Sequence, residues 1–97
     1  MAVATKKSVV SQNEVPRITG AVSPQGLAKR LGNVIRVKRA QLGYTQEVFS
    51  EHCGFFRTYM SRIETGQANM TLSALEVIAV GLNLKTSELL ALAEGEC

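Results

Sequence analysis

The chain has 97 residues, enough for one small domain with a single hydrophobic core. Hydrophobic residues make up 45% of it, only 5% are aromatic and tryptophan is absent, so the composition favours an aliphatic, helical core. The formal net charge is only +3, and no apolar run is long enough to span a membrane. Because the N-terminus lacks a continuous apolar signal region, we expect a cytoplasmic protein.

Residues 1–23 have the composition of a flexible N-terminal tail, rich in Ser, Thr, Val and Lys and without a helical period. The folded domain is therefore expected over 24–97. Ser23 and Pro24 form a good helix start, as N-cap and first helical residue. The first helix ends near Gly43, and Gly32 can let another helix approach it closely. Its expected inward residues are Leu27, Leu31, Val34, Ile35 and Leu42.

Residues 44–64 predict two short helices joined by a glycine turn. Thr45 can cap the first helix by accepting a backbone N–H, and Glu47 suits the positive helix N-terminus. Gly54 can adopt the left-handed conformation that ends a helix without steric cost. The expected inward stripe of this helix is Val48, Phe49, His52 and Cys53.

The second short helix has one apolar face and one polar, basic face. Phe55 is expected as a buried plug between the two helices, and Met60 and Ile63 give the second helix its inner side. The side chains expected to point outward are Arg57, Thr58, Tyr59, Ser61 and Arg62. Two helices joined through a glycine turn are the layout of a helix-turn-helix, whose second helix enters the DNA major groove.

Two further helices are expected after a loop over 65–69. Thr71 is the N-cap of the fourth helix, and Thr86 or Ser87 caps a last helix of about two turns with Glu88 in its first turn. The inner stripe of the fourth helix is expected to be Leu72, Leu75, Ile78, Ala79 and Leu82. The sequence therefore predicts an all-α domain of five short helices.

The last helix carries three leucines, which are more than two turns can hide within one domain. Some of them are expected to face a second copy of the chain across a two-fold axis. The alternative is that all three pack into the core of their own chain. The proposed dimer residues are Leu89, Leu90 and Leu92.

Charge is unevenly distributed along the chain. Residues 27–64 hold seven Lys or Arg against three Glu, whereas the residues after Glu64 hold one Lys against four Glu. The basic half coincides with the predicted helix-turn-helix, as a phosphate-facing surface requires. Solvated helix faces are the alternative explanation.

No catalytic or metal-binding pattern is visible in the sequence. Cys53 and Cys97 do not form a disulfide framework, and no Cys/His cluster has metal-ligand spacing. His52, the single histidine, has no acid or nucleophile placed beside it in sequence, so a packing or surface role is favoured over a catalytic one. We therefore expect no enzyme, no cofactor, no metal and no small-molecule substrate.

From Leu31 to Leu92 the chain shows a set of residues in one register. They are Leu31-Gly32, Ile35, Arg39, Gly43, Thr45-Gln46-Glu47, Cys53-Gly54, all of 57–64, Gly66, Asn69, Leu75, Ile78-Ala79, Leu82 and Ser87-Glu88-Leu89-Leu90. In this register the chain resembles the phage-repressor type of helix-turn-helix domain, the Xre or lambda-repressor-like family. The start of the second short helix, Arg57-Thr58-Tyr59, also looks like the controller proteins of restriction-modification systems.

The resemblance implies roles for individual residues. Base contacts would come from Arg57, Thr58, Ser61 and Arg62. Phosphate contacts would come from Gln46, Thr45, Tyr59 and Asn69. Arg39 and Glu64 match a structural ion pair that joins the first helix to the third. Phe56 departs from the family pattern, because it stands where a Ser, Thr or Asp cap is usual.

The function implied is a sequence-specific DNA-binding transcriptional regulator. It would act as a homodimer on a two-fold operator in double-stranded DNA, because one short recognition helix reads too few bases. The alternative is a protein-interaction module or an antitoxin on the same fold, with the Leu-rich C-terminus bound to a protein.

Overall fold

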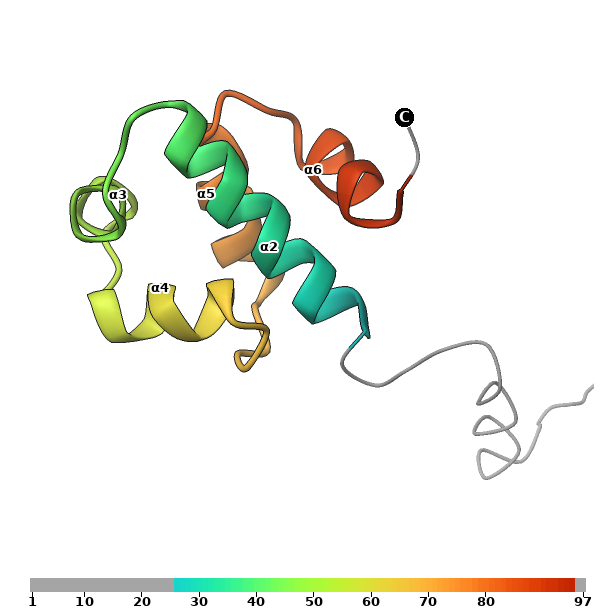
Figure 1. The fold of residues 1–97 in the computed structure, drawn as a ribbon, viewed down its shortest axis with the longest axis horizontal. Coiled ribbons are helices and arrows are strands. Elements are labelled where there is room, and N and C mark those ends of the chain that lie inside the picture. Colours follow the sequence, from blue (N-terminus) through green and yellow to red (C-terminus); the bar gives the residue numbers. More distant parts are fainter. Residues whose placement is uncertain (1–25, 96–97) are drawn as a thin grey trace, which may run out of the picture.

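The computed structural model describes residues 26–95. The expected tail over 1–23, the helix start at Ser23-Pro24 and Cys97 lie outside the described residues. Within 26–95 the chain forms five helices and no strand, which confirms the all-α expectation (Figure 1). They are α2 (Gly26–Gln41), α3 (Gln46–Cys53), α4 (Arg57–Glu64), α5 (Leu72–Gly81) and α6 (Thr86–Ala93).

Helix α2 is the longest helix of the described domain and lies across its middle (Figure 1). It packs against α6 toward one side and against α4 toward the other. Helix α3 contacts α4 and α5, and α5 also contacts α6. The helix-turn-helix, α3 and α4, is thus supported from behind by α2 and α5.

One aliphatic core joins all five helices. Its members are Leu31, Ile35, Phe49, Met60, Ile63, Leu75, Ile78, Ala79, Leu82, Leu89 and Ala93. Phe49 is the only aromatic residue among these buried core members, in keeping with the low aromatic content. The inner faces predicted for α4, Met60 and Ile63, are confirmed, because both side chains are fully buried.

The inward stripe predicted for α3 is wrong by about one residue. Phe49 and Ser50 are buried and Cys53 is half-buried, whereas Val48 is 46% exposed and His52 lies on the surface. Ser50 tolerates burial because its hydroxyl donates to the backbone oxygen of Gln46 at 2.6 Å. A buried hydroxyl satisfied within its own helix leaves no sign in the hydrophobic pattern.

Three residues predicted to be inward lie on the surface instead. Leu27, Leu42 and Leu72 are exposed, and Leu72 is the extreme case at 81%. Leu27 lies in the first turn of α2, Leu42 follows its last residue, and Leu72 is the first residue of α5. Periodicity gives the buried face of a helix but not the point at which the core ends along its axis.

Helix caps follow the sequence closely, with one exception. The hydroxyls of Thr45 and Thr71 accept backbone N–H groups of their own helices at 3.1 and 3.0 Å, as expected. The cap predicted for α6 is wrong, because that helix already begins at Thr86 and has Lys85 at the N-cap position. Its N-terminus is closed by the Glu88 carboxylate, which accepts the backbone N–H of Lys85 at 2.8 Å.

Gly32 lies where α2 and α4 cross, and α4 lies directly against the α2 backbone. A Cβ atom on Gly32 would be 2.7 Å from the carbonyl oxygen of Glu64, and it would also collide with the carbonyl oxygen of Ile63. Both atoms belong to the backbone of α4 and cannot rotate away. The expectation that glycine here permits a close helix approach is therefore confirmed.

We expect Gly32→Ala to destabilise the domain, although alanine is more favourable than glycine in a helix interior by about 1 kcal/mol. The collision with the α4 backbone should outweigh that gain and lower the free energy of unfolding by about 1–3 kcal/mol. Urea midpoints measure the effect. Gly81→Ala is the control, because the three atoms nearest to its Cβ would belong to side chains rather than to backbone: two Phe49 ring atoms, at 3.0 and 3.2 Å, and the Cys53 sulfur, at 3.7 Å. A Gly32→Ala protein as stable as wild type would show that the two helices separate easily.

Candidate nucleic-acid interface

The turn between α3 and α4 is built as the sequence predicts. Gly54 ends α3 in the left-handed conformation, with φ of 74°, and its N–H donates to the Glu51 oxygen. The chain then passes through Phe55, half-buried against the core, to the extended residue Phe56. Helix α4 starts at the next residue, and its outer face is exposed.

The outer face of α4 carries the four residues predicted to contact bases. Arg57, Thr58 and Arg62 are exposed and Ser61 is half-buried. These four side chains and Gln46, from the first turn of α3, line one hollow of about 280 Å³. The structure thus gathers residues from both helices of the helix-turn-helix around a single concave surface.

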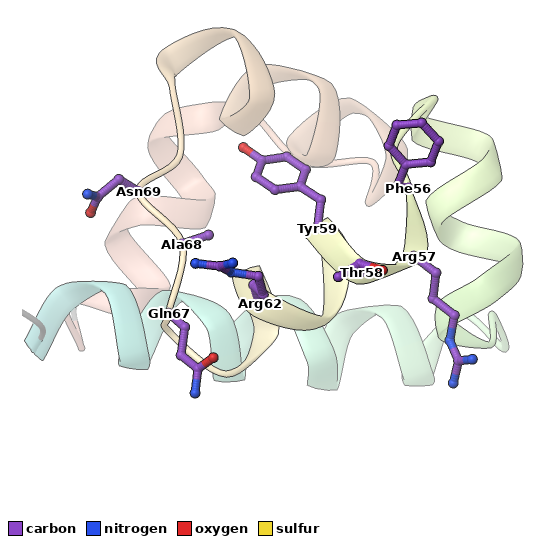
Figure 2. Close-up of a pocket in the computed structure, with 8 residues that line it drawn as sticks. All are labelled: Phe56, Arg57, Thr58, Tyr59, Arg62, Gln67, Ala68 and Asn69. Atoms are coloured by element: carbon purple, nitrogen blue, oxygen red, sulfur yellow. The ribbon is translucent and has the colours of Figure 1, made fainter.

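A second hollow, of about 620 Å³, lies on the other flank of α4 (Figure 2). It separates α4 from the loop that follows, and its lining is Phe56, Arg57, Thr58, Tyr59, Arg62, Gln67, Ala68 and Asn69. Three residues, Arg57, Thr58 and Arg62, line both hollows. Helix α4 therefore forms a ridge between two hollows.

Tyr59 and Asn69 occupy opposite walls of the second hollow (Figure 2). The Tyr59 ring packs edge-to-face on Phe55, with ring centres 5.2 Å apart. This contact holds Tyr59 in place while Figure 2 shows its hydroxyl reaching outward from α4. The two residues thus lie on the same hollow but on different elements, Tyr59 on α4 and Asn69 on the loop that follows it.

The buried carboxylate of Glu64 joins α2, α3 and α4 beneath this surface. The Glu64 side chain is 3% exposed and accepts two bonds from Arg39, from Nε at 2.7 Å and from Nη2 at 3.0 Å. Arg39 Nη1 also donates to the backbone oxygen of Tyr44 at 2.7 Å. The pair predicted from the family resemblance is present, in the two-pronged geometry that makes Arg–carboxylate bonds strong.

Glu64 also holds Gln46, a contact that the sequence did not reveal. The Gln46 amide nitrogen donates to Glu64 Oε1 at 3.1 Å. An amide nitrogen has two hydrogens, so a second one is left to donate to another group. Thr45 is placed similarly: its oxygen accepts the Val48 N–H, and its own hydroxyl proton remains free to be donated.

The two arginines of the ridge have no carboxylate partner among the described residues. Within residues 26–95, Arg39 and Glu64 make the only ion pair, so neither Arg57 nor Arg62 is neutralised by a described carboxylate. Figure 2 shows the two side chains leaving opposite ends of α4. Exposed, unpaired arginines at this spacing present donors over the length of the helix.

A family model described as the helix-turn-helix domain matches residues 30–92. This range covers the five described helices except for residues 26–29 of α2 and Ala93 of α6. The chain belongs to the helix-turn-helix domain family. It is 37% identical over 68 residues to the control protein C.MunI of Mycoplasma sp., a match that covers 69% of this chain and 92% of that protein.

Solved structures agree with this assignment. The clp gene regulator ClgR of Corynebacterium glutamicum superimposes with a TM-score of 0.70 at 26% identity, covering 78% of this chain and 96% of that one. The restriction-modification controller protein C.Esp1396I, solved as a tetramer with its natural 35-base-pair operator, gives a TM-score of 0.64 at 30% identity and covers 71% and 91%. The resemblance to controller proteins drawn from Arg57-Thr58-Tyr59 is thereby confirmed.

The dimer residues predicted for this helix-turn-helix protein need one correction. Leu89 is fully buried in the core of its own chain, so it has no surface to offer a partner, and its assignment is wrong. Leu90 is half-buried against the core, and Leu92 is 37% exposed. The cause is that α6 lies along α2, where Arg30 Nε donates to the Ala93 oxygen at 2.9 Å.

His52 and Cys53 lie away from the α4 ridge, in a hollow between α3 and α5. Burial raises the pKa of the Cys53 thiol, which disfavours its thiolate form. Across residues 26–95, no three His, Cys, Asp or Glu side chains gather as metal ligands do. No helix in that range is long and apolar enough to cross a membrane.

We expect Arg39→Ala to lower the free energy of unfolding by about 3 kcal/mol, because it leaves a buried carboxylate unpaired. Arg36→Ala is the matched control, since Arg36 is an exposed arginine of the same helix whose side-chain bond within the described part of the chain goes to Asn33. Denaturant midpoints of the two proteins give the comparison. Equal midpoints would mean that water replaces Arg39 at the Glu64 carboxylate without cost.

Proposed function

We propose that this protein is a sequence-specific DNA-binding transcriptional regulator that binds a two-fold operator as a homodimer, with α4 in the major groove. The observation that carries the proposal is the α4 ridge, where two arginines without a carboxylate partner in 26–95 and two hydroxyl residues stand on the outer face of the second helix of a helix-turn-helix. That helix is the element that enters the groove in such domains.

In this proposal Arg57, Thr58, Ser61 and Arg62 read base edges. Arginine suits guanine, because its paired donors match O6 and N7 in the major groove. The two arginines stand at residues one and six of an eight-residue helix, about 8 Å apart along its axis. They would therefore read different base pairs. The hydroxyls of Thr58 and Ser61 lie between them and can contact either a donor or an acceptor on a base edge.

Gln46, Thr45, Tyr59 and Asn69 are proposed to contact phosphates. Gln46 and Thr45 stand at the N-terminus of α3, where free backbone N–H groups and the helix dipole favour an anion. Tyr59 and Asn69 face each other across the hollow beyond α4. Phosphate contacts on both flanks of the ridge would fix its depth and register in the groove.

A homodimer is proposed because one helix of eight residues spans about 12 Å and reads only a few base pairs. The relative C.Esp1396I, solved as a tetramer on its operator, supports assembly on DNA. The surface proposed for the second copy is centred on Leu92 and includes Leu90. Leu92 lies beside Val34 and Val37 of α2 along a shallow hollow of about 250 Å³, which gives the interface apolar area beyond α6.

A non-catalytic role in the cytoplasm belongs to the same proposal. It is supported by the family match and by relatives that are control and regulator proteins. A protein-interaction module or antitoxin remains the competing function, and it predicts binding to DNA without sequence preference. Selection of bound sites from random double-stranded DNA separates the two, because only a sequence-specific regulator enriches a common two-fold sequence.

On the selected duplex, we expect Arg57→Ala and Arg62→Ala each to weaken binding by about 1–3 kcal/mol and to relax preference at one base position. Asn69→Ala is the control, because Asn69 is an exposed proposed phosphate contact outside the Arg39–Glu64–Gln46 network, and its loss should weaken selected and random duplexes alike. Fluorescence anisotropy with single-base variants provides the measurement. If both arginine variants keep the full base preference, α4 does not read the sequence through them.

We expect Leu92→Asp to yield a folded monomer with much weaker operator binding. A carboxylate at this exposed position should disrupt the contact with the second copy but not the core of its own chain. Sedimentation equilibrium measures assembly, and circular dichroism checks the fold. Val80→Asp, at an exposed residue of α5, is the matched control and should remain dimeric. A dimeric Leu92→Asp protein would move the interface elsewhere on the domain.

A further inference from the structure

Phe56 is the most exposed large hydrophobic residue among those described, at 86%. It is the N-cap residue of α4, with φ of −69° and ψ of 145°, and its side chain makes no capping hydrogen bond. Ser, Thr, Asp or Asn at this position would stabilise the helix by bonding a free N–H. Phe56 therefore contributes neither to the core nor to the cap, and folding gives no reason for a bare aromatic ring here.

The surroundings of Phe56 indicate what covers the ring. Phe56 lines the same hollow as Thr58 and Arg62, on the proposed base-reading face, and as Tyr59 and Asn69, on the proposed phosphate side (Figure 2). Its neighbour in the chain is Arg57, the first residue of the recognition helix. Phe56 is thus continuous with the proposed DNA surface, at the helix end whose residues approach base edges.

The major groove presents one prominent apolar group, the C5-methyl of thymine, and phenylalanine is among the side chains that contact it. We propose that Phe56 is a specificity-determining residue, which packs its ring on a thymine methyl in each half-site, close to the base pair read by Arg57. This assignment rests on the proposed function and adds an apolar reading position to its polar ones. The contact would remove both the ring and the methyl from water.

The hollow argues against a protein partner on Phe56. Its walls include Arg57 and Arg62, whose charges no described carboxylate neutralises. An anionic surface fits them, and a protein seated there would block the α4 ridge from DNA. A protein contact on this ring would make Phe56 matter for assembly rather than for base preference. Both the assembly and the base preference of Phe56→Ala are therefore compared with those of the wild type.

The test uses fluorescence anisotropy with the duplex recovered by site selection, in which each thymine in turn is replaced by deoxyuridine. This replacement removes only the C5-methyl. For the wild-type protein, we expect about threefold to fivefold weaker binding at one thymine position per half-site, as the loss of one buried methyl implies. Phe56→Ala should bind the unmodified selected duplex more weakly than the wild-type protein does, by a similar or larger factor. It should no longer distinguish thymine from deoxyuridine at that position.

Three controls separate the contact from indirect effects. Phe56→Ala should melt at the wild-type temperature, because alanine, like phenylalanine, does not cap a helix. Val80→Ala truncates another exposed apolar residue, on α5, and should keep the full thymine preference. Phe56→Leu keeps an apolar side chain and should restore part of that preference.

The proposal is overturned if Phe56→Ala responds to every deoxyuridine replacement as the wild type does, or if no single replacement weakens wild-type binding. A selected site without a T·A pair beside the Arg57 position would also overturn it. Loss of assembly by Phe56→Ala, with base preference intact, would assign the ring to a protein contact instead. A selection that enriches no sequence at all would overturn the proposed function itself, a result distinct from these four.

Discussion

The arrangement of the helix-turn-helix depends on one buried carboxylate. Glu64, the last residue of α4, accepts bonds from Arg39 of α2 and Gln46 of α3. A carboxylate removed from water is costly unless its charge and its oxygens are both satisfied. This requirement restricts how α4 can turn relative to the other two helices, because a rotation that breaks either bond leaves the charge poorly compensated. The orientation of the outer face of α4 follows from the same constraint.

A second constraint acts a short distance away, where the absence of a side chain on Gly32 lets the α4 backbone lie against α2. The carboxylate fixes the rotation of α4, and the glycine sets its depth. Together they hold α4 as a ridge with a hollow on each flank. A rigid ridge would benefit the proposed recognition, because the backbone that carries Arg57 and Arg62 would need little further ordering on DNA. In that proposal the scaffold beneath the surface supports specificity without touching DNA.

Much of this protein is determined by its sequence alone, because the information is local. The helices, the threonine cap at Thr45 and the glycine stop at Gly54 each depend on a few neighbouring residues and on backbone rules that hold in any protein. The outward face of α4 was predictable because Met60 and Ile63 leave only one side for the core. The family resemblance added the Arg39 pair, whose partners are far apart in sequence.

Other features were decided only when the helices packed. Sequence periodicity placed Val48 inside and did not include Ser50 in the inward stripe, whereas in the contacts of α3 with α4 and α5 Ser50 is buried and Val48 is exposed. Leu89 was assigned to a partner because a short helix was judged unable to hide it, whereas α2 supplies the surface that covers it. The bond from Gln46 to Glu64 joins residues 18 apart, and no local pattern encodes it. A sequence fixes the preferences of each segment, but which side of a segment is removed from water depends on neighbours that only the tertiary structure brings together.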